Sequence, residues 1–298
     1  MSDSNSSFDA TSSSSRRRRL RLLERCFELF ALVCLTMALA VLGLLVVKVC
    51  FDGAQRVSPQ FLLSFPSRFA EKAGLYSALI GSLYLMILTG IIAVPLGVGA
   101  ALYLEEYAPN NRLTRLIELN LVNLAGVPSI IFGILGLQVF VRTMGLGRSL
   151  LAGALTMSLL ILPVIVISSR EALRNVPRAL RDASLALGAT KLQTIWHHVL
   201  PVAFPNILTG CILAFSRALG ETAPLITMGA LTYVAFIPDS LFSPFTVLPI
   251  QTFNWISRPQ ASFHANAAGA IVVLLAVLLV FNGAAVLLRN RIQRKQTD

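Results

Sequence analysis

The chain has 298 residues, of which 55% are hydrophobic and only 13% are charged, and its mean hydropathy is +0.74. Soluble proteins carry about 25% charged residues, so the composition excludes an ordinary soluble domain and a disordered or collagenous chain. The net charge of +11 would suit a nucleic-acid-binding protein. The basic residues, however, lie in tails and short segments between apolar runs, which is typical of a membrane protein.

Six apolar segments reach the length of about 20 residues that a membrane-spanning helix needs. The predicted spans are residues 27–49, 74–104, 116–141, 150–168, 207–228 and 267–288. The sequence therefore predicts an all-α membrane protein with six transmembrane helices. Pro95 and Pro128 predict kinks in the second and third spans, because neighbouring helices in a membrane tolerate proline.

The N-terminal segment contains a Ser-rich stretch and the basic run 16–19. We expect residues 1–25 to form a disordered basic tail on the cytoplasmic side. The segment 26–50 is predicted to be an uncleaved first transmembrane helix. A secretory signal is the alternative, but this apolar stretch is too long and continues past the cleavage-like residues 38–40.

Lys and Arg are distributed unequally between the two sides of the predicted membrane. The side with both termini holds 17 of them, and the opposite side holds 7. The excess of positive charge marks the cytoplasmic side, so both termini are predicted to be cytoplasmic.

The cytoplasmic segment 170–206, called here the coupling segment, contains two short amphipathic helical patterns separated by Gly188. A glycine suits the left-handed turn between two helices. From periodicity alone, the two helices could equally lie on the lipid surface. Pro201 and Pro205 are predicted to interrupt the chain before the fifth span. On the opposite side, the Pro-rich apolar stretch 229–266 is predicted to pack on the bundle or dip into it.

Residues 182–201 read D-A-S-L-A-L-G-A-T-K-L-Q-T-I-W-H-H-V-L-P. Their spacing resembles the signature E-A-A-x3-G-x9-I-x-L-P of permeases of ATP-driven importers, with Asp182, Ser184 and His198 as departures. The resemblance implies a coupling helix that sits in a cleft of a separate ATPase subunit. The residues it assigns to ATPase docking are Asp182, Ala183, Leu187, Gly188 and Leu192.

Four further strings narrow the resemblance. They are V-P-S-I-I-F-G-I-L-G-L at 127–137, E-A-L-R-N-V-P at 171–177, S-R-A-L-G-E-T-A-P-L at 216–225 and N-W-I-S-R-P-Q at 254–260. All four resemble the PstA-type permeases of phosphate importers, which belong to the binding-protein-dependent, MetI-like (type I) permeases. The resemblance implies a permease core over residues 74–290, a cytoplasmic tail over 291–298 and a location in the bacterial cytoplasmic (inner) membrane.

The same resemblance implies partners and a cargo. The implied partners are a second, PstC-like permease, a PstB-like ATPase dimer, an extracytoplasmic PstS-like phosphate-binding protein and membrane lipid, and no nucleic acid. The implied function is import of inorganic phosphate by alternating access, driven through the coupling segment.

The remaining chemistry favours a non-catalytic subunit without a cofactor. No G-x-x-x-x-G-K-[ST] phosphate loop occurs, so nucleotide binding is expected in another chain. Adjacent His197 and His198 point about 100° apart on a helix, which suits solvated or packed imidazoles better than a metal site. The four cysteines lack metal-ligand spacing and give no indication of a disulfide framework.

Arg217 and Glu221 are the charged residues inside the predicted fifth span. Four residues apart on a helix, they would share one face, and each is costly if it faces lipid. They are interpreted either as a mutually neutralising structural pair or as pore-facing groups that handle an oxyanion, since guanidinium matches phosphate oxygens. With the neighbouring Ser216 and Thr222, they are the predicted translocation-pathway residues.

Several functions stay open at this point. The chain could be a permease for another oxyanion, an anion secondary transporter not coupled to ATP, or a non-transporting scaffold or sensor. A secondary transporter needs coupling-ion sites inside the membrane, for which the spans offer few ionisable residues. The cytoplasmic signature favours the ATP-driven permease.

Overall fold

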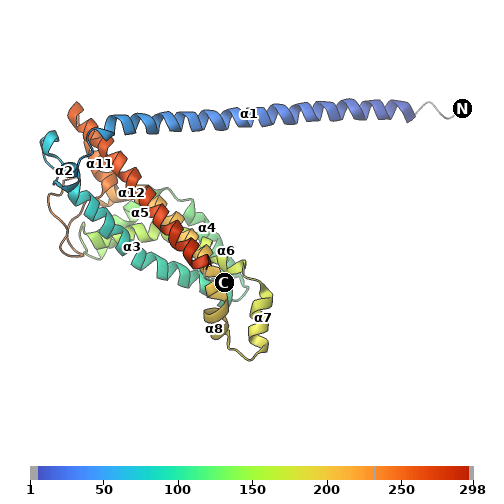
Figure 1. The fold of residues 1–298 in the computed structure, drawn as a ribbon. Helices are drawn as coiled ribbons and strands as arrows, with labels where there is room; N and C mark the ends of the chain where they lie inside the picture. Colours follow the sequence, from blue (N-terminus) through green and yellow to red (C-terminus); the bar gives the residue numbers. More distant parts are fainter. Residues whose placement is uncertain (1–5, 231–232, 295–298) are drawn as a thin grey trace. The chain divides into compact units, whose positions relative to one another are not determined.

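The computed structural model describes residues 6–230 and 233–294, in which all regular elements are helices and no strand occurs (Figure 1). The chain divides into two units, Met1–Phe51 and Asp52–Asp298. Five of the described helices are long and apolar enough to cross a membrane, or six if one bent pair counts as a span. The predicted all-α membrane fold is confirmed.

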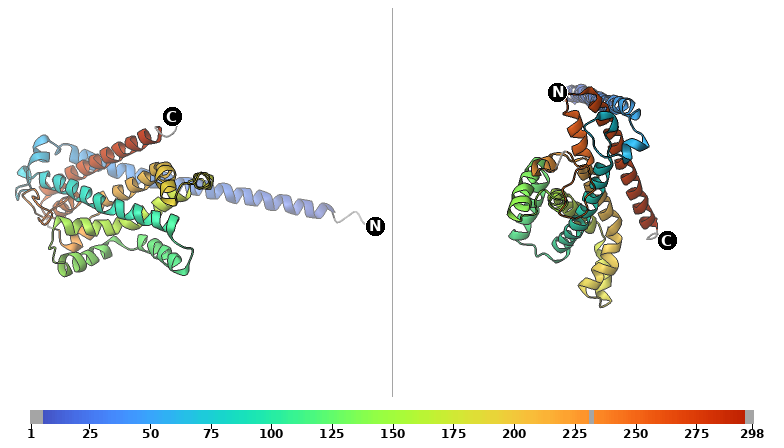
Figure 2. Two further views of the ribbon diagram at one scale, coloured as in Figure 1. Left: turned by 90° about the horizontal axis from the view of Figure 1, so that it is seen from below. Right: turned by 90° about the vertical axis from the view of Figure 1, so that its left-hand side faces the viewer.

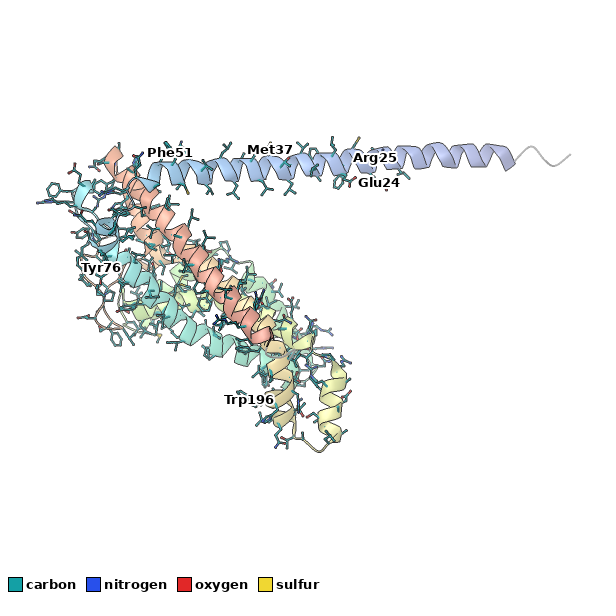
Figure 3. The ribbon with its side chains drawn as sticks, in the orientation of Figure 1. Glu24, Arg25, Met37, Phe51, Tyr76 and Trp196 are labelled. Atoms are coloured by element: carbon teal, nitrogen blue, oxygen red, sulfur yellow. The ribbon has the colours of Figure 1, made fainter. Side chains whose placement is uncertain are left out.

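The described part of the first unit belongs to helix α1 (Ser6–Ala54), whose last residues are counted in the second unit. The candidate span in this helix is Leu23–Ala54. Its apolar side chains are exposed along the helix, as Figure 3 shows around Met37. The helix begins well before the position predicted for the first span. Residues 6–25, predicted to be disordered, are helical, because no Gly or Pro interrupts the chain before Gly43. Residues 1–5 of the predicted tail lie outside the described part.

The second unit is a bundle built around α6 (Leu150–Arg174), the most buried of the candidate spans. Helix α6 packs against α3 (Tyr76–Leu102) and α9 (Leu200–Gly220), and α9 also packs against α12 (Ala261–Arg294). Figure 2 shows these long helices side by side. Helix α3 runs through Pro95 and ends in a wide π-helical turn, η2 (Tyr103–Tyr107).

The predicted third span is broken into two parts. Helix α4 (Arg112–Ala125) and helix α5 (Ser129–Gly136), which continues as η3 (Leu137–Thr143), meet at an angle of 103°. Pro128 lacks a backbone N–H and restricts the residue before it, so the helix stops at Gly126. The sequence predicted one continuous span with a kink at Pro128. This prediction was wrong, because the bend of 103° divides the segment into two separate helices.

The predicted fifth span also has different bounds. Helix α9 ends at Gly220, Glu221 is extended with φ −75° and ψ 123°, and a short helix α10 (Ala223–Met228) follows. At its other end, α9 continues without interruption from α8 (Lys191–Thr194) through the π-helical turn η4 (Ile195–Val199). Pro201 and Pro205 therefore do not interrupt the chain as predicted. Pro201 directly follows the π-helical turn η4, and helices of membrane proteins tolerate proline where local π-helical adjustments satisfy the freed backbone groups.

The stretch 229–266 packs into the bundle, as predicted. Its helix α11 (Leu248–Ile256) buries Leu248, Ile250 and Trp255 and contacts α3 and α12. The Ser82 hydroxyl of α3 accepts a hydrogen bond of 2.9 Å from the Leu248 amide. The Trp255 ring lies 5.8 Å from that of Phe61 in α2 (Pro59–Leu63). Ala70 of the short helix η1 (Ala70–Lys72) packs against the same apolar cluster. Residues 231–232 lie outside the described part.

The loop before α11 carries a carboxylate held in its ionised form. The Ser243 hydroxyl donates a hydrogen bond to the Asp239 carboxylate. This bond, with backbone amides, lowers the pKa of Asp239 below its ordinary value. The loop therefore keeps a negative charge at this end of the bundle at neutral pH.

Candidate functional site

Arg217 lies near the middle depth of the bundle. Helices α6 and α9 are antiparallel, and Gly210 approaches Ser168 so closely that an added Cβ would lie 2.1 Å from the Ser168 hydroxyl oxygen. Arg217 is two helical turns, about 10 Å, further along α9. It is therefore level with the centre of the 25-residue helix α6.

Arg217 and Glu221 meet across the end of α9. The Arg217 Nε lies 3.5 Å from the Glu221 Oε1, and the two side chains are 51% and 19% exposed. The sequence placed the two charges on one face of a helix, but Glu221 lies outside α9, so this part of the prediction was wrong. The two side chains nevertheless form a pair. The break after Gly220 leaves both charges at the edge of an irregular segment. Irregular backbone at membrane depth is tolerated only where it is buried in protein or lines a water-filled cavity.

The two neighbouring polar residues have different surroundings. The Ser216 hydroxyl donates a hydrogen bond of 2.7 Å to the Ile212 carbonyl. It also bonds the side-chain oxygen of Asn282 in α12. Thr222 stands at the start of α10 without a side-chain capping bond. Both are partly exposed, and their role in a pathway stays a prediction. Asn282 is a polar group beside this site that sequence reasoning missed.

The broken third span lies beside the break at Glu221. An added Cβ on Gly133 of α5 would lie 1.8 Å from the Thr227 Oγ1 and 2.5 Å from the Pro224 carbonyl of α10. One turn on, Gly136 of α5 and Met228 of α10 both contact Thr156 of α6. Helices α5 and α10 thus run in the same direction, and their N-terminal breaks lie at the same end. Two interrupted helices therefore meet near the mid-depth charge pair.

We expect the substitution Gly133→Ala to disturb this junction. The added methyl cannot fit against Thr227 and the α10 backbone without movement, and such overpacking costs about 1–3 kcal/mol. The amount of folded protein recovered from membranes, and its thermal midpoint in detergent, should both fall. The matched control is Gly99→Ala in α3, where an added Cβ meets nothing within 4 Å. Equal loss in both variants would contradict the close-packing argument.

The coupling segment forms the predicted helical pair. Helix α7 (Arg178–Ala186) ends before Gly188, whose φ is +87°, and α8 follows. The Thr190 side chain and Gln193 form a capping box at the start of α8. The buried Ser184 and Thr194 hydroxyls bond each other at 2.9 Å and hold the two helices together. The predicted turn at Gly188 is confirmed.

This helical pair projects from one end of the bundle (Figure 1) and exposes apolar side chains. Leu187 is 89% exposed, and Leu192 and Trp196 are also exposed; Figure 3 shows Trp196 pointing outward. Asp182 and Ala183 lie on the exposed part of α7. An apolar surface with a polar rim is typical of a protein-binding site. Assignment of these residues to ATPase docking stays a proposal.

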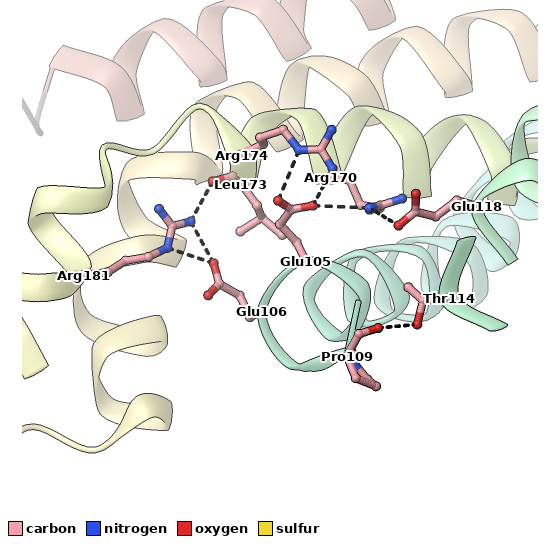
Figure 4. Close-up of polar contacts among 9 residues, drawn as sticks. All are labelled: Glu105, Glu106, Pro109, Thr114, Glu118, Arg170, Leu173, Arg174 and Arg181. Atoms are coloured by element: carbon pink, nitrogen blue, oxygen red, sulfur yellow. Dashed lines mark hydrogen bonds and ion pairs between the residues drawn. The ribbon is translucent and has the colours of Figure 1, made fainter. Parts of the chain in front are cut away.

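An ion-pair network lies where the coupling segment meets the bundle, and Figure 4 shows its members. Glu105 of η2 accepts hydrogen bonds from Arg174, at 3.2 Å from Nε and 3.1 Å from Nη2. It also lies 3.4 Å from the Arg170 Nη2, which in turn lies 2.7 Å from the Glu118 Oε1 of α4. Through these residues α6 is joined to η2 and α4.

The adjacent Glu106 has a different partner. Its Oε1 accepts hydrogen bonds from the Nε and Nη2 of Arg181 in α7, at 3.1 and 2.8 Å. Arg181 also donates to the Val176 and Leu173 carbonyls at the end of α6, at 2.7 and 2.8 Å. Sequence reasoning missed this network, because its partners lie 52 to 75 residues apart in the chain.

Together these features define a class of protein. The long apolar helices cross a membrane, two breaks place a charge pair at mid-depth, and a helical pair offers an apolar tip to a partner. Within the described residues, no group of three or more His, Cys, Asp or Glu side chains could hold a metal ion. This combination is that of an α-helical membrane permease.

The comparison with protein families agrees. Residues 93–295 match the family described as "Binding-protein-dependent transport system inner membrane component". The chain belongs to this family, whose members are multi-pass proteins of the inner membrane.

Two curated relatives match over most of the chain. The "Probable ABC transporter permease protein YqgI" of Bacillus subtilis (strain 168) is 34% identical over 89% of this chain and 94% of the relative. The "Phosphate transport system permease protein PstA 1" of Mycobacterium tuberculosis (strain ATCC 25618 / H37Rv) is 36% identical over 75% of this chain and 71% of the relative.

Solved structures share the fold. A bacterial alginate ABC transporter in complex with an alginate-bound periplasmic protein matches with a TM-score of 0.65 and 16% identity, over 93% of this chain and 98% of the solved chain. The MetNI methionine ABC transporter in an inward-facing form matches with a TM-score of 0.54 and 18% identity, over 74% and 94%. The predicted MetI-like fold is confirmed.

Proposed function

We propose that the chain is a PstA-type permease that carries inorganic phosphate across the cytoplasmic membrane. Its relatives named as phosphate permeases, at 34–36% identity, support this cargo. The observation that carries the proposal is the Arg217 guanidinium at mid-depth, beside the breaks in two spans. Interrupted helices near the centre of a membrane are where transporters handle their substrates.

The charge pair suits passage of an anion. Arg217 supplies the positive potential and the forked donors that match phosphate oxygens. Glu221, 3.5 Å away, weakens that attraction, so the anion is admitted without being trapped. In this proposal Ser216 and Thr222 belong to the same pathway.

ATP hydrolysis is assigned to a separate, PstB-like ATPase dimer. Helices α7 and α8 supply the docking surface, with Leu187 and Leu192 as apolar contacts and Gly188 as the turn between them. A PstC-like second permease completes the pathway. A PstS-like binding protein delivers phosphate on the other side of the membrane. The family description, which names a binding-protein-dependent system, supports a binding protein as a partner.

The test uses the complete importer. A tagged chain is purified from its native membrane with its partner subunits and placed in liposomes. We expect ATP hydrolysis to rise with phosphate-loaded binding protein, and phosphate to accumulate on the side of the membrane that carries the ATPase, opposite to the binding protein. Arsenate, sulfate and molybdate serve as competitors. Uptake of another oxyanion in preference to phosphate would overturn the cargo, and uptake without ATP would overturn the coupling.

We infer from the distribution of Lys and Arg that both termini are cytoplasmic. The coupling segment then lies on the cytoplasmic side, and α11 lies near the outer side.

We expect single cysteines to report this orientation. In a background without the four native cysteines, Ala186→Cys in α7 should react with a membrane-impermeant maleimide only after the cells are opened. Gln55→Cys, before α2, should react in intact cells. Both positions are exposed in this chain. The permease is expressed without the ATPase, so that the docking surface stays accessible to the reagent. The reverse labelling pattern would contradict the orientation.

A further inference from the structure

We propose that the π-helical turn η2 receives the movement of the coupling segment, and that the Arg181–Glu106 bond is its main linkage. The inference rests on the proposed function, because it supposes an ATPase that moves α7 and α8. It assigns Glu106 and Arg181 as positioning residues of the coupling step. Neither residue touches the docking tip around Leu187 or the pair at Arg217.

The Arg181 guanidinium joins three elements at once. It belongs to α7, it caps the end of α6 through the Leu173 and Val176 carbonyls, and it holds Glu106 with two donors. Its side chain is 18% exposed and that of Glu106 is 8% exposed. Both donors bond the same carboxylate oxygen, and an ion pair so removed from water has a defined geometry, in contrast to a solvated ion pair. Displacement of α7 is therefore passed to η2.

A second contact connects the same two parts of the molecule. The Lys191 Nζ of α8 lies 5.0 Å from the centre of the Tyr107 ring, which belongs to η2. Both helices of the projecting pair thus contact one five-residue turn, α7 through Glu106 and α8 through Tyr107. The turn is the direct continuation of α3, the helix that packs along α6.

The π-helical geometry explains how adjacent glutamates serve different helices. The Ala108 amide bonds the Tyr103 carbonyl at 2.8 Å, five residues back, which widens this turn. Glu105 then reaches Arg170 and Arg174 of α6, while Glu106 reaches Arg181 of α7. Such π-helical turns occur frequently at functional sites. Glu105 fixes η2 to the bundle, and Glu106 fixes the coupling segment to η2.

The charges of the network balance, since Glu105, Glu106 and Glu118 face three arginines. Removal of one member leaves a buried charge unpaired and destabilises the protein, whereas removal of both members of a pair avoids that penalty. The double variant Glu106→Gln/Arg181→Gln therefore tests the linkage with the least damage to folding.

The test compares phosphate transported per ATP hydrolysed in reconstituted importers. For the double variant we expect the ATPase to co-purify at the wild-type ratio, with ATP hydrolysis retained. Phosphate per ATP should fall on the order of fivefold, because coupling energies carried by individual contacts are modest. The single variant Glu106→Gln should lose coupling by a similar factor. Arg181→Gln should lose coupling too and should also lower the amount of folded protein, because it removes the hydrogen bonds to the Leu173 and Val176 carbonyls.

The control is Arg115→Gln, which removes an exposed arginine of α4 that is not a member of the ion-pair network. It should keep the wild-type ratio of phosphate to ATP. An unchanged ratio in the double variant would overturn the linkage, as would a fall that is equal in the control. A wild-type importer that fails to transport phosphate with its binding protein would instead overturn the proposed function, so the two failures are distinct.

Discussion

Arg217→Gln is expected to reduce phosphate uptake by about tenfold or more, because a hydrogen bond to a charged group contributes about 1.5–3 kcal/mol. The guanidinium is the positive group at mid-depth beside both helix breaks. Glutamine keeps much of the side-chain length but offers no charge and no fork. The measurement is the initial rate of phosphate uptake per assembled complex, with docking followed by ATPase co-purification.

Glu221→Gln is the companion variant and has a different expected result. Loss of the carboxylate leaves Arg217 unopposed, so the anion is held longer and the turnover rate falls while ATPase docking persists. The change should appear in the number of ATP molecules used per phosphate. Normal uptake per complex in both single variants would remove the pair from the pathway.

A purely structural pair gives another pattern. Each single variant would then lower complex yield, and the swapped variant Arg217→Glu/Glu221→Arg would recover both yield and uptake. The geometry argues against a large structural contribution, because Arg217 is half exposed and the Nε–Oε1 distance is 3.5 Å. Such pairs contribute about 0–1 kcal/mol. We therefore expect near-normal yields, and no recovery of uptake in the swap.

The sequence predicted the long apolar spans well because membrane-crossing length is a local property of composition. The bounds of α3 agree with the predicted second span to within a few residues, and α6 begins where the fourth span was predicted but ends later. Helix α12 is longer at both ends than the predicted sixth span. The turn at Gly188 was also local, since a glycine between two amphipathic patterns needs no tertiary partner. Its positive φ confirms that argument.

The breaks were harder to predict. Hydropathy does not distinguish a straight span from two apolar helices at 103°, so Pro128 indicated only a kink. At Glu221, the apolar residues after the charge suggested that the helix continues to Met228. The chain instead becomes extended for one residue and restarts with Pro224 in the first turn of α10. Proline in a first turn is a start signal, and it was present in the sequence.

The network around η2 could not be predicted from one sequence. Glu105 and Glu106 read as ordinary interfacial charges, and the arginines 65 to 75 residues later read only as orientation signals. Their pairing depends on the packing of α3 against α6, which periodicity does not specify. One local feature of the sequence pointed to the network. The helical pattern continues past the apolar end of α3, so Glu105 and Glu106 are placed at the same end of the bundle as the basic coupling segment.

Gly188→Val is expected to abolish most substrate-stimulated ATP hydrolysis and phosphate uptake while the permease still inserts into the membrane. The φ of +87° costs an L-residue about 1–2 kcal/mol, and a β-branched side chain is among the least tolerant. The turn between α7 and α8 would rearrange, and Leu187 and Leu192 would no longer present one surface to the ATPase. The measurement is binding-protein-stimulated ATPase activity, with membrane insertion checked by immunoblot.

Two further variants separate backbone strain from a clash with the partner. An added Cβ at Gly188 meets nothing within 4 Å in this chain, so side-chain size alone is harmless before docking. Asparagine tolerates the left-handed conformation better than alanine does, although it is larger. If strain governs the defect, activity should rank Gly188→Asn above Gly188→Ala and both above Gly188→Val. If the ATPase cleft excludes any side chain, alanine, the smallest, should retain the most activity. Full stimulated activity in Gly188→Val would show that α7 and α8 do not dock on the ATPase.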